Sequence, residues 1–417
     1  HRLSLASIVL NIGVSVLMAS ESLIAICAMI VGTLSVVLAT PLVAIANGAN
    51  WMMLHSVDPF AYLGLASIRL PEYSGWAAGI YFLYYLPLTL LTLQLMRWQP
   101  LKPPKRAFRT RCWSGLPLMG YGVLSTTILL HPFSTGSTGG RLRIDFLDVG
   151  QGDSALLTMP DGTTLLIDGG GRPDFTRTEQ RDLFERDTRS IGEAVVSEYL
   201  WWRGIDSVDY VLATHADADH IDGLNDVVRN FIVRAALVGR TPSDDPEYAK
   251  FSVTTEMQSV PVVVTSSSDT LLFGDVSARV LWPPPMTKQN APSQNNDSVV
   301  LQVRYGNRQM LLTGDIEKGA ESSLVRRGAD LRSDVVKVAH HGSKTSSIDG
   351  FVQATSPKLA IISVGERSIF GHPNREVVTR WQASGAEVLI TGKCGTITVS
   401  TDGTKLLVET FLNRSGD

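Results

Sequence analysis

Long apolar runs dominate the first 130 residues of the chain. Four of them carry almost no charge, and each is long enough to cross a bilayer as a helix. Only Glu21 separates the first two runs, and Pro41 is expected to break or kink the second. Residues 51–73 mix Trp, His, Asp and Arg with apolar side chains, which is more typical of an interfacial segment. The four predicted spans are residues 3–19, 22–46, 76–96 and 112–131.

A basic stretch separates the third and fourth runs. Residues 97–111 contain six Lys or Arg and no Asp or Glu. Short basic loops between spans usually face the cytoplasm, so the chain after the fourth span is predicted to lie on the opposite side. A basic stretch can also bind nucleic acid, but its three prolines and its place between two spans favour the topological interpretation. The predicted domains are transmembrane helices at 1–133, a flexible linker at 134–140 and an extracytoplasmic domain at 141–417.

The hydrophobic pattern changes after residue 140. Short apolar runs now alternate with turn residues and amphipathic stretches, which is typical of an α/β domain. Several of the predicted strands end in an Asp or a His. Strands are predicted at residues 141–149, 154–159, 163–167, 208–214, 310–313 and 335–339, and a helix at 191–203.

The most informative polar group follows the strand predicted at 208–214. His215, Asp217, Asp219 and His220 place four potential metal ligands within six positions. Alternate residues of an extended loop can point the same way, whereas adjacent residues must diverge and can serve two ions. Helix capping near residue 221 would explain Asp219, but not the two histidines and the second carboxylate. The loop therefore predicts a dinuclear metal site.

Other polar residues also follow predicted strands. Asp168, Asp315 and the pair His340 and His341 each come directly after an apolar run. His372 stands in a Gly-His-Pro turn, where it could protonate a leaving oxygen, bind phosphate or simply hold the turn. All five histidines beyond residue 140 are accounted for if they belong to one site.

Charge is divided unevenly along the chain. Only eight of the 37 Lys and Arg and three of the 40 Asp and Glu lie in the first 140 residues, so the second part is acidic. An acidic domain argues against broad affinity for nucleic acid through a basic surface, although metal ions can still hold a polyanion locally. The three cysteines, Cys27, Cys112 and Cys394, do not form a disulfide framework. Because the first residue is His1, we expect the chain to be a fragment of a longer protein.

Five motifs together resemble the metallo-β-lactamase fold. They are Leu-Asp-Val-Gly-Gln-Gly-Asp at 147–153, Ile-Asp-Gly-Gly at 167–170, the loop at 214–220, Leu-Thr-Gly-Asp at 312–315 and Val-Ala-His-His-Gly-Ser-Lys at 338–344. More narrowly, they resemble the carboxy-terminal domain of ComEC-type DNA-uptake proteins of naturally transformable bacteria. The resemblance implies transmembrane helices followed by an αββα four-layer sandwich, in a multi-pass protein of the bacterial inner membrane with a periplasmic domain. It implies incoming DNA, as duplex or single strand, the lipid bilayer and other competence proteins as partners.

The resemblance also implies roles for individual residues. His215 and Asp217 would hold one ion, and Asp219, His220 and His340 would hold the second. The sequence does not rank the two adjacent histidines. We select His340 and keep its neighbour, His341, as its partner.

The remaining predicted site residues act on these ions or on substrate. Asp315 would bridge the ions, and Asp168 would orient the ligands or a bound water. Lys344, with the neighbouring hydroxyls, could receive a phosphate as a point charge, or it could be an ordinary solvated lysine. The predicted catalytic residues are Asp168, Asp219, Asp315, Lys344 and His372.

The chain departs from the family pattern at two places. Most relatives have a His where this chain has Asp217, and a further His ligand where this chain has residues 295–298, Asn-Asn-Asp-Ser. Oxygen ligands are harder than imidazole, so two divalent metal ions are predicted with Mn²⁺ favoured and Zn²⁺ or Mg²⁺ as alternatives. A pair of such ions suits phosphodiester hydrolysis of incoming DNA. Two alternatives stay open: a membrane-anchored hydrolase of another phosphodiester or ester, and a DNA-guiding module whose site has decayed.

Overall fold

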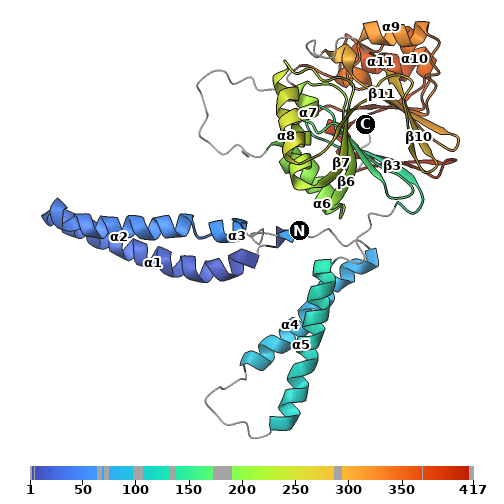
Figure 1. The fold of residues 1–417 in the computed structure, drawn as a ribbon. Coiled ribbons are helices and arrows are strands. Elements are labelled where there is room, and N and C mark those ends of the chain that lie inside the picture. Colours follow the sequence, from blue (N-terminus) through green and yellow to red (C-terminus); the bar gives the residue numbers. More distant parts are fainter. Residues whose placement is uncertain are drawn as a thin grey trace. The chain divides into compact units, whose positions relative to one another are not determined.

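The computed structural model describes residues 2–3, 5–62, 68–69, 75–96, 107–130, 138–171, 190–285, 294–368 and 370–412. The chain divides into two compact units, His1–Ser134 and Thr135–Asp417. The described residues of the first unit are mainly helical, apart from a two-residue pairing of β1 (Arg2–Leu3) with β2 (Ile68–Arg69). The second contains both large sheets (Figure 1).

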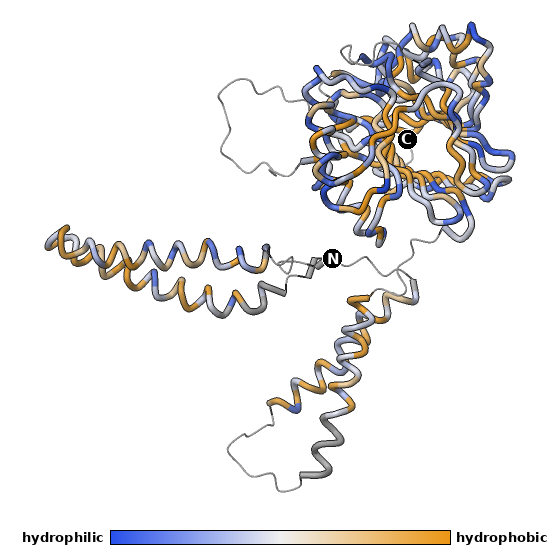
Figure 2. The backbone as a smooth tube through the Cα atoms, in the orientation of Figure 1, coloured by the Kyte–Doolittle hydropathy of each residue, from blue (hydrophilic) through white to orange (hydrophobic). Residues whose placement is uncertain are grey.

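The first unit consists of apolar helices that pack in pairs. Helix α1 packs against α2, and α4 packs against α5, where the Tyr84 hydroxyl donates to the Tyr121 hydroxyl at 2.8 Å. Many of their large apolar side chains are exposed, as expected for helices surrounded by lipid. Figure 2 shows hydrophobic residues along these helices. The elements are α1 (Leu5–Leu34), α2 (Val36–Leu54), α3 (Asp58–Tyr62), a 3₁₀ turn η1 (Gly75–Ala78), α4 (Gly79–Met96) and α5 (Ala107–Leu130).

By length and composition, three segments of the described chain could cross a membrane. They are Gly13–Leu34, Val36–Phe60 and Trp76–Met96, and a shorter apolar helical segment covers Gly115–Leu130. The predicted boundary between the first two spans was wrong: the chain breaks at Ser35, not at Glu21. A single Glu is a good helix former and does not interrupt α1. Pro41 lies in the second turn of α2, and the helix continues through it although proline donates no backbone hydrogen bond, so the predicted break is not found there.

Two predicted connections fall largely outside the described residues. Residues 97–106 of the basic loop and 134–137 of the linker are not described, and residues 107–111 belong to the start of α5. The cytoplasmic placement of the loop stays a prediction.

The second unit is built on an eight-stranded and a seven-stranded sheet. The eight-stranded sheet runs in the order β17 (Leu406–Thr410), β16 (Ile397–Thr401), β3 (Leu142–Phe146), β4 (Ala155–Thr158), β5 (Thr164–Ile167), β6 (Ser207–Ala213), β7 (Ile232–Val238) and β8 (Val262–Val264). The seven-stranded sheet runs in the order β15 (Glu387–Ile390), β14 (Leu359–Ile362), β13 (Val335–Lys337), β12 (Arg308–Leu312), β11 (Val300–Tyr305), β10 (Val276–Trp282) and β9 (Thr270–Phe273).

Three hydrophobic cores hold four layers together. The first lies between the sheets and combines alternate residues such as Ile144 and Leu157 of one sheet with Val280 and Met310 of the other. The second lies under helices on the outer face of the eight-stranded sheet, and the third under helices on the outer face of the other (Figures 1 and 2). The helices are η2 (Gly192–Ser197, a π-helix), α6 (Glu198–Trp202), α7 (Ala218–Asn230) and α8 (Pro246–Met257) on one side, and α9 (Lys318–Arg326), α10 (Asp349–Thr355) and α11 (Arg375–Ala383) on the other. The predicted αββα sandwich is confirmed.

The parallel strands of each sheet lie where the predicted site residues occur. Strand β5 is parallel to β6, and β12, β13 and β14 are parallel to one another. Parallel neighbours end at the same edge of their sheet, so the residues that follow them are brought together.

Candidate metal centre

The ends of four strands deliver charged side chains to one place. Asp168 follows β5, His215 follows β6 and Asp315 follows β12, while His341 stands in the 3₁₀ turn η4 (Ala339–Gly342) after β13. Potential ligand atoms lie within 4.8 Å of one another in four overlapping groups of three. These groups are His215, His220 and Asp315; Asp219, His220 and His341; Asp153, Asp315 and His341; and Asp153, Asp168 and His220.

Asp315 is the centre of this cluster. Its Oδ2 lies 3.2 Å from His220 Nε2 and 3.1 Å from His341 Nε2. Its Oδ1 accepts from Lys337 Nζ at 3.3 Å. The same Nε2 of His341 also lies 3.5 Å from Asp219 Oδ2. One carboxylate oxygen of Asp315 therefore faces two imidazole nitrogens, as it would if all three atoms were ligands of one ion.

The cluster has donor atoms without hydrogen-bond partners. Nε2 of His215, His220 and His341 and Oδ1 of Asp153 are buried, and none has a hydrogen-bond partner. Buried polar atoms are almost always paired, and each exception needs an explanation. Imidazole nitrogens that converge with carboxylates are the ligand set of borderline and hard divalent cations. The residues present therefore fit divalent metal ions.

Backbone strain is concentrated at the same place. Asp168, His340 and His341 have φ of 57°, 51° and 52°, in the left-handed region that costs non-glycine residues energy. Two consecutive left-handed residues turn the adjacent imidazoles apart. His341 points into the cluster and is buried, whereas Nδ1 of the less buried His340 lies 3.2 Å from Thr345 Oγ1 and 3.4 Å from Glu317 Oε1.

Neighbouring groups fix the imidazoles of the cluster. Asp168 Oδ2 lies 2.9 Å from His220 Nδ1, and the same carboxylate accepts from the backbone N–H and the hydroxyl of Thr214, both at 2.8 Å. His341 Nδ1 lies 2.9 Å from the carbonyl oxygen of Ser363. Both rings thus present Nε2 to Asp315, as metal-binding histidines do when an outer group holds Nδ1.

Opposite charges govern protonation in the cluster. Burial opposes a charge on His220, but Asp315 and Asp168 outweigh it and hold the pKa of His220 well above its ordinary value. Burial likewise opposes a charge on His341, whose pKa Asp315 and Asp153 hold well above the ordinary value. For Asp315, burial would raise the pKa, yet His220, His341 and Lys337 hold it well below the usual range. A cation that binds these nitrogens must displace their protons, so metal binding is expected to release protons.

Two residues of the cluster were not predicted as site residues. Asp153 ends the first motif, and it enters the cluster because the chain before it packs closely: a Cβ on Gly152 would lie 1.9 Å from the carbonyl oxygen of Asp219. Lys337 is buried; its Nζ contacts Asp153 and donates to Gly314 O at 2.9 Å as well as to Asp315. The sequence could have indicated this role, because a lysine in an otherwise apolar buried strand is rare unless its charge is paired.

Asp217 lies at the edge of the cluster. The helix after the loop begins at Ala218, earlier than predicted, and Asp217 rather than Asp219 is its N-cap residue. Its side chain is 46% exposed, with Oδ2 3.5 Å from His215 Nε2. Burial would raise the pKa of Asp217, but the neighbouring His215 lowers it overall. An ion bound by His215 and Asp217 would therefore be more accessible to solvent than one bound at His341.

The segment at residues 295–298 has mainly structural contacts. Asn296 Oδ1 accepts from the backbone N–H groups of Glu317 and Ala320 at 2.9 and 3.3 Å, and Asp297 pairs with the buried Arg240. Asn295 Nδ2 lies 3.5 Å from His340 Nε2, so Asn295 is the member of the segment that faces the pocket histidines.

A pocket of about 420 Å³ opens onto the cluster. His340 and His372 both line it, and their ring centroids lie 5.8 Å apart. Burial and the neighbouring His341 and His340 lower the pKa of His372, which favours the neutral imidazole. Lys344 is exposed and is not among the described residues that line the pocket. The pocket is lined by Ala216, Asp217, Ala218, Asp219, Asp245, Pro246, Glu247, Asp315, His340, His341, Phe370 and His372.

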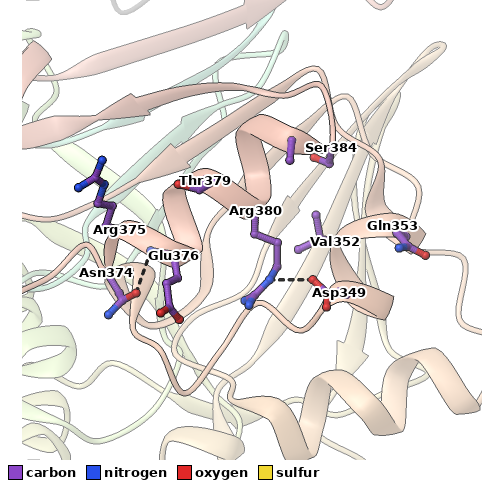
Figure 3. Close-up of a pocket in the computed structure, with 10 residues that line it drawn as sticks. Asp349, Val352, Gln353, Asn374, Arg375, Glu376, Thr379, Arg380 and Ser384 are labelled. Carbon is purple, nitrogen blue, oxygen red and sulfur yellow. Dashed lines mark hydrogen bonds and ion pairs between the residues drawn. The ribbon is translucent and has the colours of Figure 1, made fainter.

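A larger groove of about 810 Å³ runs between α10 and α11 (Figure 3). Arg380 Nε donates to Asp349 Oδ1 at 2.8 Å across it, and Asn374 caps α11. Its lining includes Arg375, Arg380, Asp349 and Glu376, so its charges balance, and it includes none of the cluster residues. The smaller pocket is therefore the candidate site.

Comparisons with known proteins agree with this geometry. The metallo-beta-lactamase superfamily matches residues 147–366. The chain is 31% identical to "ComE operon protein 3" of Bacillus subtilis over 281 residues, which are 67% of this chain and 36% of that protein. It is 27% identical to "Competence protein ComA" of Neisseria gonorrhoeae over 355 residues, 83% of this chain and 44% of that protein. It is 26% identical to "Recombination protein 2" of Haemophilus influenzae over 309 residues, 74% of this chain and 34% of that protein.

These relatives confirm the resemblance to ComEC-type proteins that the motifs predicted. The chain spans less than half of the length of each of the three. The family match covers more than half of this chain and includes every strand end that contributes to the cluster. The chain belongs to the metallo-beta-lactamase superfamily.

Proposed function

We propose that the chain is part of a membrane protein of DNA uptake, and that its Thr135–Asp417 unit is a metal-dependent phosphodiesterase that cuts incoming DNA. Two curated relatives are named as competence proteins or products of a competence operon, which supports DNA handling. Membership of a superfamily of metal-dependent hydrolases supports the reaction class. The observation that carries the proposal is the grouping of His215, His220 and His341 around Asp315, with no hydrogen-bond partner at any of the three Nε2 atoms, beside a pocket that Asp315 and His341 line.

The ligand sets follow from the distances. One cation would be held by His215, Asp217 and Asp315, and the second by Asp219, His220, His341 and Asp315. His341 replaces His340, which was selected from the sequence, because Nε2 of His341 lies in the cluster. The high share of carboxylate oxygen favours Mn²⁺ over Zn²⁺, with Mg²⁺ as a further alternative.

The residues around the cations would have different roles in the reaction. When bound, divalent cations supply charge neutralisation at the phosphate and lower the pKa of water. Asp168 holds His220 in the orientation that keeps Nε2 at the centre. His372 faces the same pocket as a neutral imidazole; it would first accept a proton from the attacking water and, once protonated, deliver that proton to the leaving oxygen. Lys344, exposed on the loop after His341, would contact a phosphate beyond the scissile one.

The topology is part of the proposal. The apolar helices support a membrane protein, and the basic stretch at residues 97–111 supports a cytoplasmic loop before the last crossing. The catalytic unit would then lie in the periplasm, on the side from which DNA arrives.

Cleavage by the purified Thr135–Asp417 unit tests the reaction. We expect DNA to be cut in Mn²⁺, and the cutting to stop with a chelator or in Asp219→Ala. Glu409→Gln, which changes an exposed carboxylate on β17, is the matched control and should keep full activity. Turnover of small diesters with intact DNA would instead support a hydrolase of another phosphodiester or ester. Absence of both bound metal and turnover would support a DNA-guiding module.

A further inference from the structure

We infer that Phe370 and His372 form a stacking platform for an unpaired nucleobase beside the metal centre, so that the site takes single-stranded rather than duplex DNA. The inference rests on the proposed function. It names the form of DNA that this pocket accepts and the residue that selects it.

The platform is defined by ring geometry. Phe370 is 50% exposed at the rim of the pocket. Its ring stacks with that of His372 at an interplanar angle of 26°, with centroids 6.1 Å apart. Both residues share the pocket lining with Asp219, Asp315 and His341 of the metal cluster. An exposed aromatic face therefore stands next to the place where a scissile phosphate would bind.

The charge of the pocket points to the same substrate. Among the described lining residues there are five carboxylates and neither a Lys nor an Arg. Proteins that hold DNA through its backbone use basic side chains, so apart from the metal ions this part of the pocket offers no groups for the second phosphate strand of a duplex. Metal ions would hold one phosphate, and stacking would supply the remaining affinity, at about 1–3 kcal/mol per base.

Stacking on Phe370 requires a base that has left the duplex. Bases inside a duplex already stack on their neighbours and do not expose a π-face to a protein ring. Trp201 and Trp202 belong to α6 and do not line the pocket, and the ring of Trp201 packs against that of Phe231 with centroids 5.1 Å apart. Of the described pocket-lining residues, Phe370 is the one Phe, Tyr or Trp.

Kinetics with three substrates test the inference on the 417-residue chain in detergent. The substrates are a 20-nucleotide single strand, the matching duplex and bis(p-nitrophenyl) phosphate, which has no base. Phe370→Ala is expected to raise KM for the single strand by about 5- to 150-fold, which corresponds to the loss of one stacked base, and to change kcat/KM for the small diester far less. Phe370→Trp should restore KM, and Phe411→Ala, at an exposed Phe that does not line the pocket, should behave as wild type.

Three outcomes overturn the inference. The first is an unchanged KM for the single strand in Phe370→Ala. The second is a loss of kcat/KM for the small diester as large as the loss for the single strand. The third is a preference of the wild-type chain for the duplex over the single strand. If the wild type cuts none of the substrates, the proposed reaction fails, and binding decides the inference separately. A single strand that contains 2-aminopurine should then lose fluorescence on wild-type protein and keep it on Phe370→Ala, and equal signals would overturn the platform.

Discussion

Two groups of buried charges lie in the Thr135–Asp417 unit, and they differ in how completely they are paired. The first surrounds Asp145 on β3, whose side chain is fully buried. Arg143 and Arg203 donate to its two oxygens at 2.9 and 2.7 Å, and the Thr398 hydroxyl donates at 2.6 Å. The Asp145 carboxylate has its partners within the protein, so this group needs no ligand.

The second group is the metal cluster, and it is incomplete. Asp315 and Lys337 are paired, but Nε2 of His215, His220 and His341 lack hydrogen-bond partners. Both groups contain buried charges. Of the two, the metal cluster is the one in which potential metal ligands without hydrogen-bond partners lie close together. Buried charges alone therefore do not mark a functional site, whereas unpaired ligand atoms around one carboxylate do.

Asp315→Asn should produce the largest effect of the changes considered. The amide removes the charge of the proposed bridging oxygen, so DNA cleavage in Mn²⁺ should fall to background and cation binding should weaken. Cleavage rates and calorimetric Mn²⁺ titration measure the two effects, with Glu409→Gln as the control. Retained cleavage with normal Mn²⁺ affinity would show that Asp315 is not a ligand of the cations.

Asp145→Ala should have the opposite profile. It leaves the largely buried Arg203 and the partly exposed Arg143 without their carboxylate, and breaking a buried ion pair costs about 3–5 kcal/mol of unfolding free energy. Urea unfolding followed by circular dichroism measures this loss. Activity per folded molecule should stay at the wild-type level. A loss of activity without a loss of stability would contradict the structural role of the Asp145 group.

Glu321 is another buried charged residue, and its contribution to stability depends on pH. Burial raises its pKa from 4.5 to about 7, although the backbone N–H groups of Ile348 and Ser347 donate to it. Because the folded state binds this proton more tightly than the unfolded state, the contribution of Glu321 to stability is largest below pH 4.5 and is lost as pH rises through about 7. The loss is about 3 kcal/mol at most. Urea unfolding at several pH values in chelator should show this decline of the unfolding free energy in wild type and a weaker decline in Glu321→Gln. An equal pH dependence in the two proteins would contradict the raised pKa of Glu321.

Asp168→Asn should have the smallest effect. Asp168 holds His220 and Thr214 but lies outside both proposed ligand sets, so Mn²⁺ affinity or activity should fall by about 10–100-fold. A drop as complete as that of Asp315→Asn would instead make Asp168 a direct ligand. Mn²⁺ titration and cleavage rates distinguish the two roles.

The sequence predicted the sandwich and most of the cluster because strand ends carry a simple signal. An apolar run that ends in Asp or His shows which residues reach the edge of the sheet, as for Asp168, His215 and Asp315. The helix pairs of the first unit were less predictable. Glu21 looked like a boundary, yet α1 continues through it to Leu34.

The rest depended on backbone geometry and long-range packing. The choice between His340 and His341 is set by two consecutive left-handed residues, a conformation that side-chain patterns do not reveal. Asp153 reaches the cluster because Gly152 packs against Asp219, far along the chain. Lys337 looked like one polar position in an apolar strand, and only the neighbouring strand shows that it faces Asp315.

The central claim is that the unpaired imidazoles around Asp315 bind divalent cations. Crystals of the Thr135–Asp417 unit grown with Mn²⁺ and measured at the manganese absorption edge test it directly. The account predicts anomalous peaks within bonding distance of Asp315 Oδ2, with His220, His341 and Asp219 around one peak and His215 and Asp217 beside the other. No peak among these side chains at saturating Mn²⁺ would contradict the account.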